Sequence, residues 1–356
     1  MVLYGSMEKS TQGRSRLALW YSAFRGFYDR NNSQNADFIA RFLFSSRSVI
    51  LVISAQAAII AGLMAYLFSS FNAIRFVILF IGFIDAHALS NLSNDYFGYF
   101  RGDDSPDSPR RMYTIHPIAD GVITRHEAKL SLMVLLVIGI IIAAYFTLSV
   151  GIYTLLFFGL GVALLFFYDA APTPLKAIGL GEIASFLAWG PVMIAGGFYV
   201  ISGHLSVIPV IAGIPYGLGV MSILWGKHID QEAYDSSKRI RTMPVILGTR
   251  VSRDAGIAII SLVYVSVFLS VIFSILPTTS VIILVSVPAA IMGIRRFGSP
   301  RPESPPEGFV GWPLWFHRGA LNFNRRFGWS YILSLVAAAV LLHIPVVEHF
   351  ILLKIL

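Results

Sequence analysis

Nine long apolar runs constrain the fold of this chain more than any other feature. Each has about 20 residues, the length that an α-helix needs to cross the hydrocarbon core of a bilayer. Strand-length alternation is absent from the runs, which argues against a β-barrel. The sequence therefore predicts an all-α, polytopic membrane protein with about nine transmembrane helices. We place these helices near 48–69, 72–94, 129–148, 151–168, 182–201, 206–225, 256–275, 277–294 and 328–347.

The composition agrees with this class of protein. The chain is 56% hydrophobic and 13% charged, whereas a soluble domain carries roughly 25% charged residues. The chain has no cysteine. This excludes disulfides, thiol nucleophiles and Cys-ligated metals, including haem-thiolate and iron–sulfur centres.

The basic residues predict the orientation. Of the 27 Lys and Arg residues, 25 lie in the N-terminal arm and in the loops after helices 2, 4, 6 and 8, and only Arg75 and Lys354 lie on the other side. By the positive-inside rule, the N-terminus and these loops are cytoplasmic. The same asymmetry explains the net charge of +8 without a nucleic-acid partner. We expect a cytoplasmic arm over 1–47, a transmembrane domain over 48–347 and a short tail over 348–356.

The N-terminal arm carries apolar residues at helical spacing, with arginines nearby. They are Leu17, Trp20, Tyr21, Phe24, Phe27 and Tyr28. This pattern is typical of an amphipathic helix that lies on the membrane surface, and a partly disordered arm is the alternative. We expect no cleavable signal peptide, because the first apolar run begins near residue 48 and is long enough to span.

Two acid-rich segments, 94–104 and 230–235, directly follow apolar runs on the predicted cytoplasmic side. Carboxylates clustered at a membrane edge repel one another unless a cation binds between them. The pattern therefore indicates a divalent metal and a phosphate-bearing ligand. His228 is a further candidate metal ligand, but oxygen ligands favour Mg²⁺ over Zn²⁺.

A polar stripe runs along the second apolar segment. His87, Asn91, Asn94 and Asp95 share one helix face, and Asp85 lies slightly deeper. Polar groups inside a membrane helix usually face a cavity, which is the prediction here. Hydrogen bonding between helices is the alternative.

Basic residues accompany the acid-rich segments. Arg110 and Arg111 follow the first, Lys176 stands alone in the loop over 168–182, and Lys227 and Lys238 flank the second. Arginine and lysine are the usual protein ligands of phosphate oxygens. The alternatives are a solvated charged loop for the arginines and a simple positive-inside residue for Lys176. Glu182 fits the favourable position of an acid at a helix N-terminus.

Three ordered motifs carry a resemblance to a known family. The first is Asn-Asp-Tyr-Phe at 94–97, followed by Gly-Asp-Asp at 102–104 and His-Pro-Ile at 116–118. The second runs from Tyr168 through Lys176 to Gly-Leu-Gly-Glu at 179–182, and the third ends in Arg-Thr-Met-Pro-Val-Ile-Leu-Gly at 241–248. From about 45 to 345, the chain resembles the UbiA superfamily of intramembrane prenyltransferases. The first two motifs are most similar to the branch that prenylates dihydroxynaphthoate in menaquinone synthesis, and the third resembles a less characterised branch.

The resemblance implies a Mg²⁺-dependent enzyme that ionises an isoprenyl diphosphate to an allylic cation, which a lipophilic, often aromatic, acceptor attacks. It implies a multi-pass protein with a cytoplasmic-facing site, which we expect in the plasma membrane of a prokaryote. The implied metal ligands are Asn94, Asp95, Asp103, Asp104, Asp230 and Asp235, of which Asp95, Asp104, Asp230 and Asp235 are the catalytic candidates. The implied substrate-binding residues are Asn91, Asn94, Arg111, Tyr168, Lys176, Lys227, Lys238 and Arg241.

Two positions depart from the family pattern. Gly98 stands where the first motif normally has an acid, and Asp230 and Asp235 are five residues apart instead of four. Asp103 or Asp107 is the candidate substitute in the first motif, and Glu232 in the second. A transporter or non-catalytic prenyl-lipid-binding protein, and an inactive scaffold of lipid-quinone synthesis, are the alternative functions. A transport path is disfavoured because the charged residues gather on one side.

Overall fold

The computed structural model describes residues 15–26, 36–102 and 108–344, and every regular element in these ranges is helical. The first half contains α1 (Arg16–Phe24), α3 (Phe38–Ser45), η1 (Ser48–Ile50), α4 (Val52–Phe68), α5 (Ala73–Arg101), α6 (Pro109–Tyr113), α7 (Arg125–Ser149), α8 (Tyr153–Leu165), η2 (Phe166–Ala170) and η3 (Leu175–Ala177). The second half contains α9 (Gly181–Leu187), η4 (Ala188–Val192), α10 (Met193–Ser202), α11 (Ile208–Ser237), α12 (Met243–Leu247), α13 (Thr249–Ile272), η5 (Thr278–Ser286), α14 (Val287–Gly298) and α15 (Trp315–Leu341).

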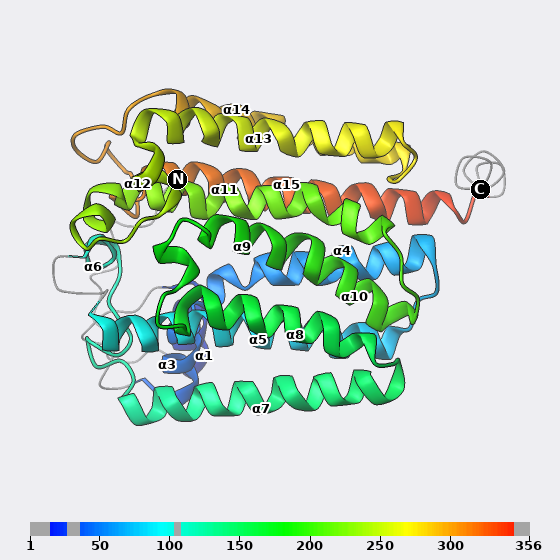
Figure 1. The fold of residues 1–356 in the computed structure, drawn as a ribbon, viewed down its shortest axis with the longest axis horizontal. Helices are drawn as coiled ribbons and strands as arrows, with labels where there is room; N and C mark the ends of the chain where they lie inside the picture. The colour runs from blue at the N-terminus through cyan, green and yellow to red at the C-terminus, as the bar shows by residue number, and fades with distance from the viewer. Residues whose placement is uncertain (1–14, 27–35, 103–107, 345–356) are drawn as a thin grey trace.

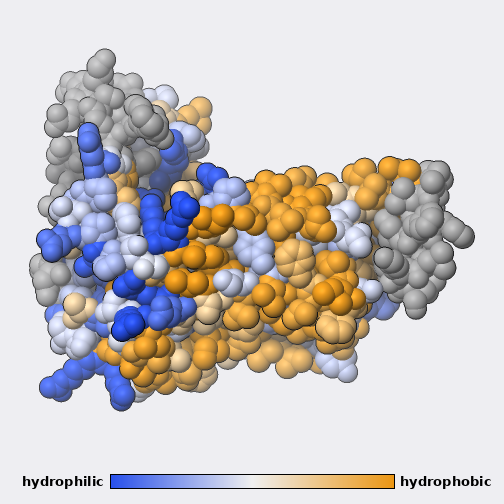
Figure 2. Space-filling view, turned by 90° about the horizontal axis from the view of Figure 1, so that it is seen from above, coloured by the Kyte–Doolittle hydropathy of each residue, from blue (hydrophilic) through white to orange (hydrophobic). Residues whose placement is uncertain are grey.

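The long helices run side by side in one bundle, with their connections at its two ends (Figure 1). The longer connections, which lead out of α5, η2, α11 and α14, gather at the same end as α6 and α12. In the space-filling view, polar residues gather at that end and apolar residues cover the shaft (Figure 2). The bundle therefore confirms the predicted all-α membrane architecture and brings the ends of α5 and α11, which carry Asp95 and Asp235, to one end.

Seven helical segments are long and apolar enough to cross a membrane. They correspond to seven of the nine predicted runs. The predicted run at 151–168 forms the shorter apolar helix of α8 and η2, and the run at 328–347 begins within α15, which ends at Leu341. The count of nine stays a prediction.

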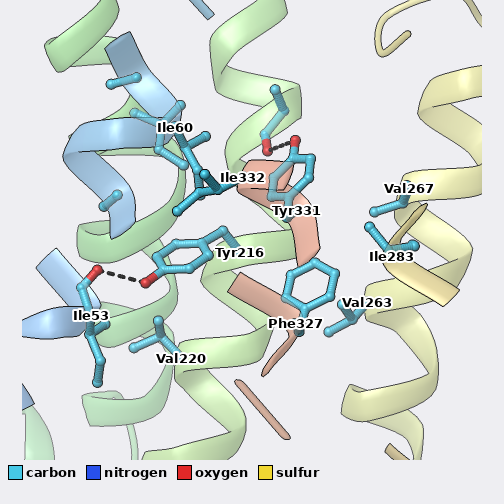
Figure 3. Close-up of a cluster of buried hydrophobic side chains, with 14 of the residues drawn as sticks. Ile53, Ile60, Tyr216, Val220, Val263, Val267, Ile283, Phe327, Tyr331 and Ile332 are labelled. Atoms are coloured by element: carbon cyan, nitrogen blue, oxygen red, sulfur yellow. Dashed lines mark hydrogen bonds between the residues drawn. The ribbon is translucent and has the colours of Figure 1, made fainter. Parts of the chain in front are cut away.

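The central helix is α11, which packs against α15, α13 and η4. Two buried tyrosines within an apolar cluster join α11 to α4 and α15 to α11 (Figure 3). The Tyr216 hydroxyl donates to the carbonyl of Ile53 at 2.6 Å, and the Tyr331 hydroxyl donates to the carbonyl of Ala212 at 2.9 Å. A hydroxyl buried among apolar groups is costly unless it is paired, so each tyrosine contributes a large ring without an unpaired donor.

Three glycines let the backbones of η4 and α11 come into direct contact. A Cβ atom at Gly190 would come within 2.7 Å of the Gly213 carbonyl oxygen and 2.8 Å of the Gly217 Cα. Small residues at such crossings increase van der Waals contact where lipid supplies no hydrophobic driving force. This contact fixes the middle of the bundle, from which α11 extends toward the polar end.

The N-terminal arm forms two short helices at the polar end, α1 and α3 (Figure 1). The Trp20 indole donates to both carboxylate oxygens of Asp37, the N-cap of α3, at 3.0 and 2.9 Å. Leu17 and Tyr21 are exposed on α1. Of the residues in the predicted amphipathic pattern, Phe27 and Tyr28 lie outside the described residues. A surface role of this arm stays a prediction.

Candidate functional site

A polar pocket opens at the polar end of the bundle. It contains roughly 700 Å³ of space between atoms, part of it open to solvent. It is lined by Arg47, Asn94, Ser108, Pro109, Arg110, Tyr113, Tyr168, Lys176, Lys227, His228, Gln231, Tyr234, Asp235, Ile240 and Thr242. Five of the residues implied by the motifs, Asn94, Tyr168, Lys176, Lys227 and Asp235, therefore line one pocket although they are far apart in the sequence.

Asp95 lies at this pocket as the centre of a buried ion-pair cluster. Its side chain is fully buried. Arg110 binds it with both terminal nitrogens, Nη2 lying 2.9 Å from Oδ2, and Arg47 contacts Oδ1. Bidentate, charge-assisted pairing of this kind holds a guanidinium in a defined plane. Asp95 thus orients two arginines that line the pocket, and both of its oxygens are already engaged.

Sequence reasoning missed Arg47; it named Arg110 and Arg111 together as candidate phosphate ligands and chose Arg111 as the substrate-binding residue. The predicted member of the arginine pair was Arg111, which instead forms an ion pair with Asp120 and does not line the pocket. Arg47 precedes η1 in a left-handed backbone conformation, with φ at 54°. The side-chain amide of Asn91 donates from Nδ2 to the carbonyl of Ser46, the residue before Arg47, at 2.8 Å. Asn91 therefore supports the segment that presents Arg47 rather than facing the pocket itself.

Lys176 and Asn94 meet across the pocket wall. Lys176 Nζ donates to Asn94 Oδ1 at 3.0 Å. Lys176 is presented by η3, directly after the η2 segment that carries Tyr168. The amide of Arg241 donates to the Ala177 carbonyl at 3.0 Å, which joins this loop to the segment after α11. Arg241 itself is exposed, and its neighbour Thr242 lines the pocket instead.

The polar face of α11 is formed by residues one turn apart. Lys227, Gln231 and Asp235 follow one another at intervals of four and line the pocket. Each residue advances an α-helix by about 100°, so Asp230 projects about 140° away from Asp235. Because α11 continues as one helix to Ser237, no break in the helix compensates for the extra residue between Asp230 and Asp235, and the two acids point in different directions.

Asp230 has another task. It is buried, and its carboxylate accepts the backbone amides of Phe316 and His317 at 3.1 and 2.9 Å. These amides lie in the first turn of α15, where backbone donors lack helical partners. Asp230 therefore caps α15. The motif comparison had implied that it shares the pocket with Asp235, and this expectation is wrong. Lys238 also lies away from the lining, with its ammonium 5.4 Å from the centre of the Tyr234 ring.

Glu182 and His228 form a buried pair beside the pocket. His228 Nδ1 lies 2.7 Å from Glu182 Oε1, and both side chains are buried. A carboxylate on one ring nitrogen fixes the orientation of the imidazole. His228 lines the pocket, so its other nitrogen is the one available to a ligand. The contact explains Glu182 better than the helix-terminus effect predicted from sequence.

The polar stripe on α5 serves both purposes that the sequence left open. Asn94 lines the pocket, as a cavity-facing residue should. His87 lies deeper, where its Nδ1 pairs with the Ser54 hydroxyl at 2.9 Å, and the Trp189 indole donates to the same hydroxyl at 3.0 Å. The inner part of the stripe therefore joins α5 to α4 and η4.

Two hydroxyls at the pocket have no hydrogen-bond partner among the described residues. Ser108 and Thr242 are 2% and 1% exposed, and both line the pocket. A buried hydroxyl without a partner is costly, so these groups are positioned to donate to a ligand. Together with the four cations Arg47, Arg110, Lys176 and Lys227, they suit an anion with several oxygen atoms.

The pocket also has oxygen donors for a metal. Among the described residues, no group of three or more His, Cys, Asp or Glu side chains could hold an ion by itself. Gln231 and Asp235 nonetheless bring oxygen-bearing side chains to the lining, as does Asn94, whose Oδ1 also accepts a hydrogen bond from Lys176. Mg²⁺ commonly takes one or two carboxylates and completes its shell with water and substrate phosphates. The donor set therefore fits a Mg²⁺ shared with a phosphate ligand. Asp103, Asp104 and Asp107 lie outside the described residues.

The family model and the known proteins that resemble this chain all indicate the same family. Residues 55–317 match the model of the UbiA prenyltransferase family. A UbiA prenyltransferase domain-containing protein 1 from Xenopus tropicalis is 26% identical over 238 residues, 65% of each chain. The 1,4-dihydroxy-2-naphthoate octaprenyltransferase of Escherichia coli is 27% identical over 166 residues, 45% of this chain and 53% of that one. The chain thus spans about half to two thirds of the curated relatives that it matches.

Solved structures share the fold. A UbiA homolog from Aeropyrum pernix has a TM-score of 0.59 at 15% identity, over 82% of this chain and 96% of that one. A UbiA homolog from Archaeoglobus fulgidus, bound to GPP and Mg²⁺, has a TM-score of 0.55 at 13% identity, over 83% of this chain and 99% of that one. The predicted resemblance is confirmed, since the family model covers most of the chain and the helical bundle matches UbiA structures. The chain belongs to the UbiA prenyltransferase family.

Proposed function

We propose that this protein is an intramembrane prenyltransferase that moves an isoprenyl group from an isoprenyl diphosphate to a lipophilic acceptor. The observation that carries the proposal is the convergence of Arg47, Arg110, Lys176 and Lys227 on one pocket at the polar end of an apolar bundle. A diphosphate needs several cations around it, and its prenyl chain needs an apolar environment. The relatives from Archaeoglobus fulgidus that bind GPP or DMAPP with Mg²⁺ support this ligand class.

In the proposed reaction, the bond between C1 of the prenyl chain and the diphosphate oxygen breaks, and the diphosphate leaves with the electron pair. The arginines and lysines of the pocket stabilise the negative charge that develops on the leaving group. The Ser108 and Thr242 hydroxyls donate to its oxygens. Mg²⁺, held by Asp235 with Gln231 and Asn94, would supply further neutralisation of the diphosphate charge. The allylic cation is then attacked by a carbon atom of the acceptor, which loses a proton.

Aromatic side chains provide the rest of the site. Tyr113, Tyr168 and Tyr234 line the pocket, and the negative face of an aromatic ring stabilises a nearby carbocation. For the acceptor, we propose an aromatic quinone precursor. The relatives named 1,4-dihydroxy-2-naphthoate octaprenyltransferase and 2-carboxy-1,4-naphthoquinone phytyltransferase support this class, and menaquinone synthesis is the corresponding biological role.

The proposal includes a location. We place the protein in the plasma membrane of a prokaryote as a multi-pass protein, with the pocket facing the cytoplasm. The concentration of 25 of the 27 Lys and Arg residues on one side supports this orientation.

The direct test is prenyl transfer by purified protein in detergent. The protein is incubated with Mg²⁺, labelled geranylgeranyl diphosphate and a panel of quinone precursors, and both prenylated product and released diphosphate are measured. Arg110→Gln should lower turnover by at least about tenfold, because a charge-assisted contact contributes roughly 1.5–3 kcal/mol. Lys129→Gln is the matched control, since Lys129 is exposed on α7 and does not line the pocket.

Three observations favour a non-catalytic relative of the same fold. Asp95 is committed to arginines, Gly98 replaces a motif acid, and Asp235 is the one carboxylate among the described pocket residues. A binding or transport protein would bind geranylgeranyl diphosphate with Mg²⁺ yet release no diphosphate with any acceptor. That outcome would leave the pocket assignment intact and overturn the proposed transfer.

A further inference from the structure

A second pocket lies between α14, α15 and the loop that joins them. It contains roughly 760 Å³ of space between atoms, part of it open to solvent, and shares no lining residue with the first pocket. Three arginines line it: Arg296 on α14, and Arg318 and Arg325 on α15. Among the described residues, no Asp or Glu does so. The pocket therefore gathers positive charge that its own lining does not neutralise.

Arg296 is held in a defined orientation. Its guanidinium lies 4.5 Å from the centre of the Trp315 ring and 5.5 Å from that of Phe309. Nη1 donates to the Trp315 carbonyl at 3.3 Å. A Cβ atom at Gly319 would come within 3.0 Å of Arg296 Cδ, so the absence of a side chain there lets Arg296 cross α15. Stacking on aromatic rings leaves the edge of a guanidinium free to meet an anion.

Arg318 is positioned in a similar way. Gly311, at a φ of +89°, brings its backbone so close that a Cβ atom would lie 2.6 Å from Arg318 Nη2. Asp230, whose charge reaches Arg296, directs its carboxylate to the amides of Phe316 and His317 rather than into the pocket. Contacts within the chain thus hold Arg296 and Arg318 in place, and the carboxylate of Asp230 is directed to the start of α15.

The same pocket has an apolar wall. Met292 on α14 and Leu321 on α15 line it beside Phe309, and Met292 is exposed on the shaft of the bundle. Both helices continue from here along the apolar shaft (Figures 1 and 2). A ligand for this pocket therefore combines a negative headgroup with apolar chains that can lie against the helices.

We propose that this pocket binds the headgroup phosphate of an anionic glycerophospholipid, with its acyl chains along α14 and α15. Basic pockets between transmembrane helices on the cytoplasmic side are suited to anionic lipid headgroups. The exposed Met292 in its lining favours a bilayer lipid over the prenyl diphosphate, whose Mg²⁺ needs the carboxylate that only the first pocket supplies among the described residues.

The test measures lipid binding to the delipidated, purified full chain. Native mass spectrometry in detergent counts bound phosphatidylglycerol and phosphatidylcholine, and inorganic phosphate and geranylgeranyl diphosphate serve as competitors. The variant is Arg318→Gln with Arg325→Gln. The control is Arg295→Gln with Arg326→Gln, which removes the same amount of charge from α14 and α15, the two helices that line the pocket, at exposed positions outside the lining.

We expect phosphatidylglycerol to bind in preference to phosphatidylcholine. Its affinity should fall roughly thirtyfold in the pocket variant and stay unchanged in the control. Four results would each overturn the proposal: equal binding of phosphatidylcholine, equal loss in the control, displacement by millimolar inorganic phosphate, or displacement by geranylgeranyl diphosphate. If the double variant does not fold, Arg325→Gln alone, at an exposed position, provides the same comparison against Arg326→Gln.

Discussion

Asp95 and Arg110 form a bidentate ion pair at the candidate site, with Arg110 Nη2 2.9 Å from Asp95 Oδ2. The motif comparison had implied that Asp95 holds a metal. In the structure, its oxygens hold Arg110 and Arg47, and the arginines line the pocket. Asp95 of the first acidic motif therefore holds two arginines in place, and these arginines bring positive charge to the pocket.

Asp95→Asn should destabilise the protein even when no metal is present. Removing one partner of a buried ion pair costs about 3–5 kcal/mol, because the remaining charges stay buried without compensation. Unfolding in detergent with a chelator measures this effect, and Asp254→Asn, at an exposed position on α13, is the control. Unchanged stability together with a loss of Mg²⁺-dependent binding would restore Asp95 as a metal ligand.

Asp230 and Asp235, both on α11, should differ in their effects. Asp235→Asn should weaken Mg²⁺-dependent binding of geranylgeranyl diphosphate by at least about tenfold, since it removes a charged oxygen ligand. Asp230→Asn should leave that binding within about twofold but lower the stability by about 1–2 kcal/mol, because the start of α15 loses a charged cap. Binding titrations and unfolding of both variants check the pair. Equal loss of binding in both would contradict the position of Asp230 at the start of α15.

Glu182 and His228 should behave as a coupled pair. A double-mutant cycle of Glu182→Gln and His228→Ala should give a coupling energy of about 0.5–3 kcal/mol, the range for residues in direct contact. Unfolding of the wild type, both single variants and the double variant measures it. Additive effects would mean that the 2.7 Å contact contributes nothing.

The predicted orientation can be checked at the two ends of the η5–α14 segment. The chain has no cysteine, so single-cysteine variants carry no background. Thr278→Cys should react with a membrane-impermeant maleimide in intact cells, whereas Ser299→Cys should react only after permeabilisation, as the positive-inside rule requires. Both residues are exposed. The reverse labelling would place the pocket on the outer face.

Local sequence properties predicted the large-scale architecture. Apolar length alone indicated the helices, because each span must satisfy its own backbone within lipid. The uneven distribution of Lys and Arg indicated which loops share a side, and these loops gather at one end of the bundle. The motif spacing also indicated Asn94, Tyr168, Lys176 and Asp235, which do line one pocket.

Neighbouring residues were harder to distinguish. The sequence favoured Arg111 and Asp230, and the structure places Arg110 and Gln231 at the pocket instead. One residue turns a helix by about 100°, so the rotation of a helix within the bundle decides which neighbour faces a ligand. That rotation is set by packing, as where α11 crosses η4 at Gly213 and Gly217.

By itself, the sequence determined that this chain is a helical membrane protein of the UbiA type with its acids and bases concentrated at one end. The tertiary structure decided the task of each charge. It directs Asp95 to Arg47, a residue 48 positions away, and turns Asp230 toward the start of α15. Periodicity and charge counts depend on local composition, whereas these contacts depend on how distant helices pack, which no local pattern encodes.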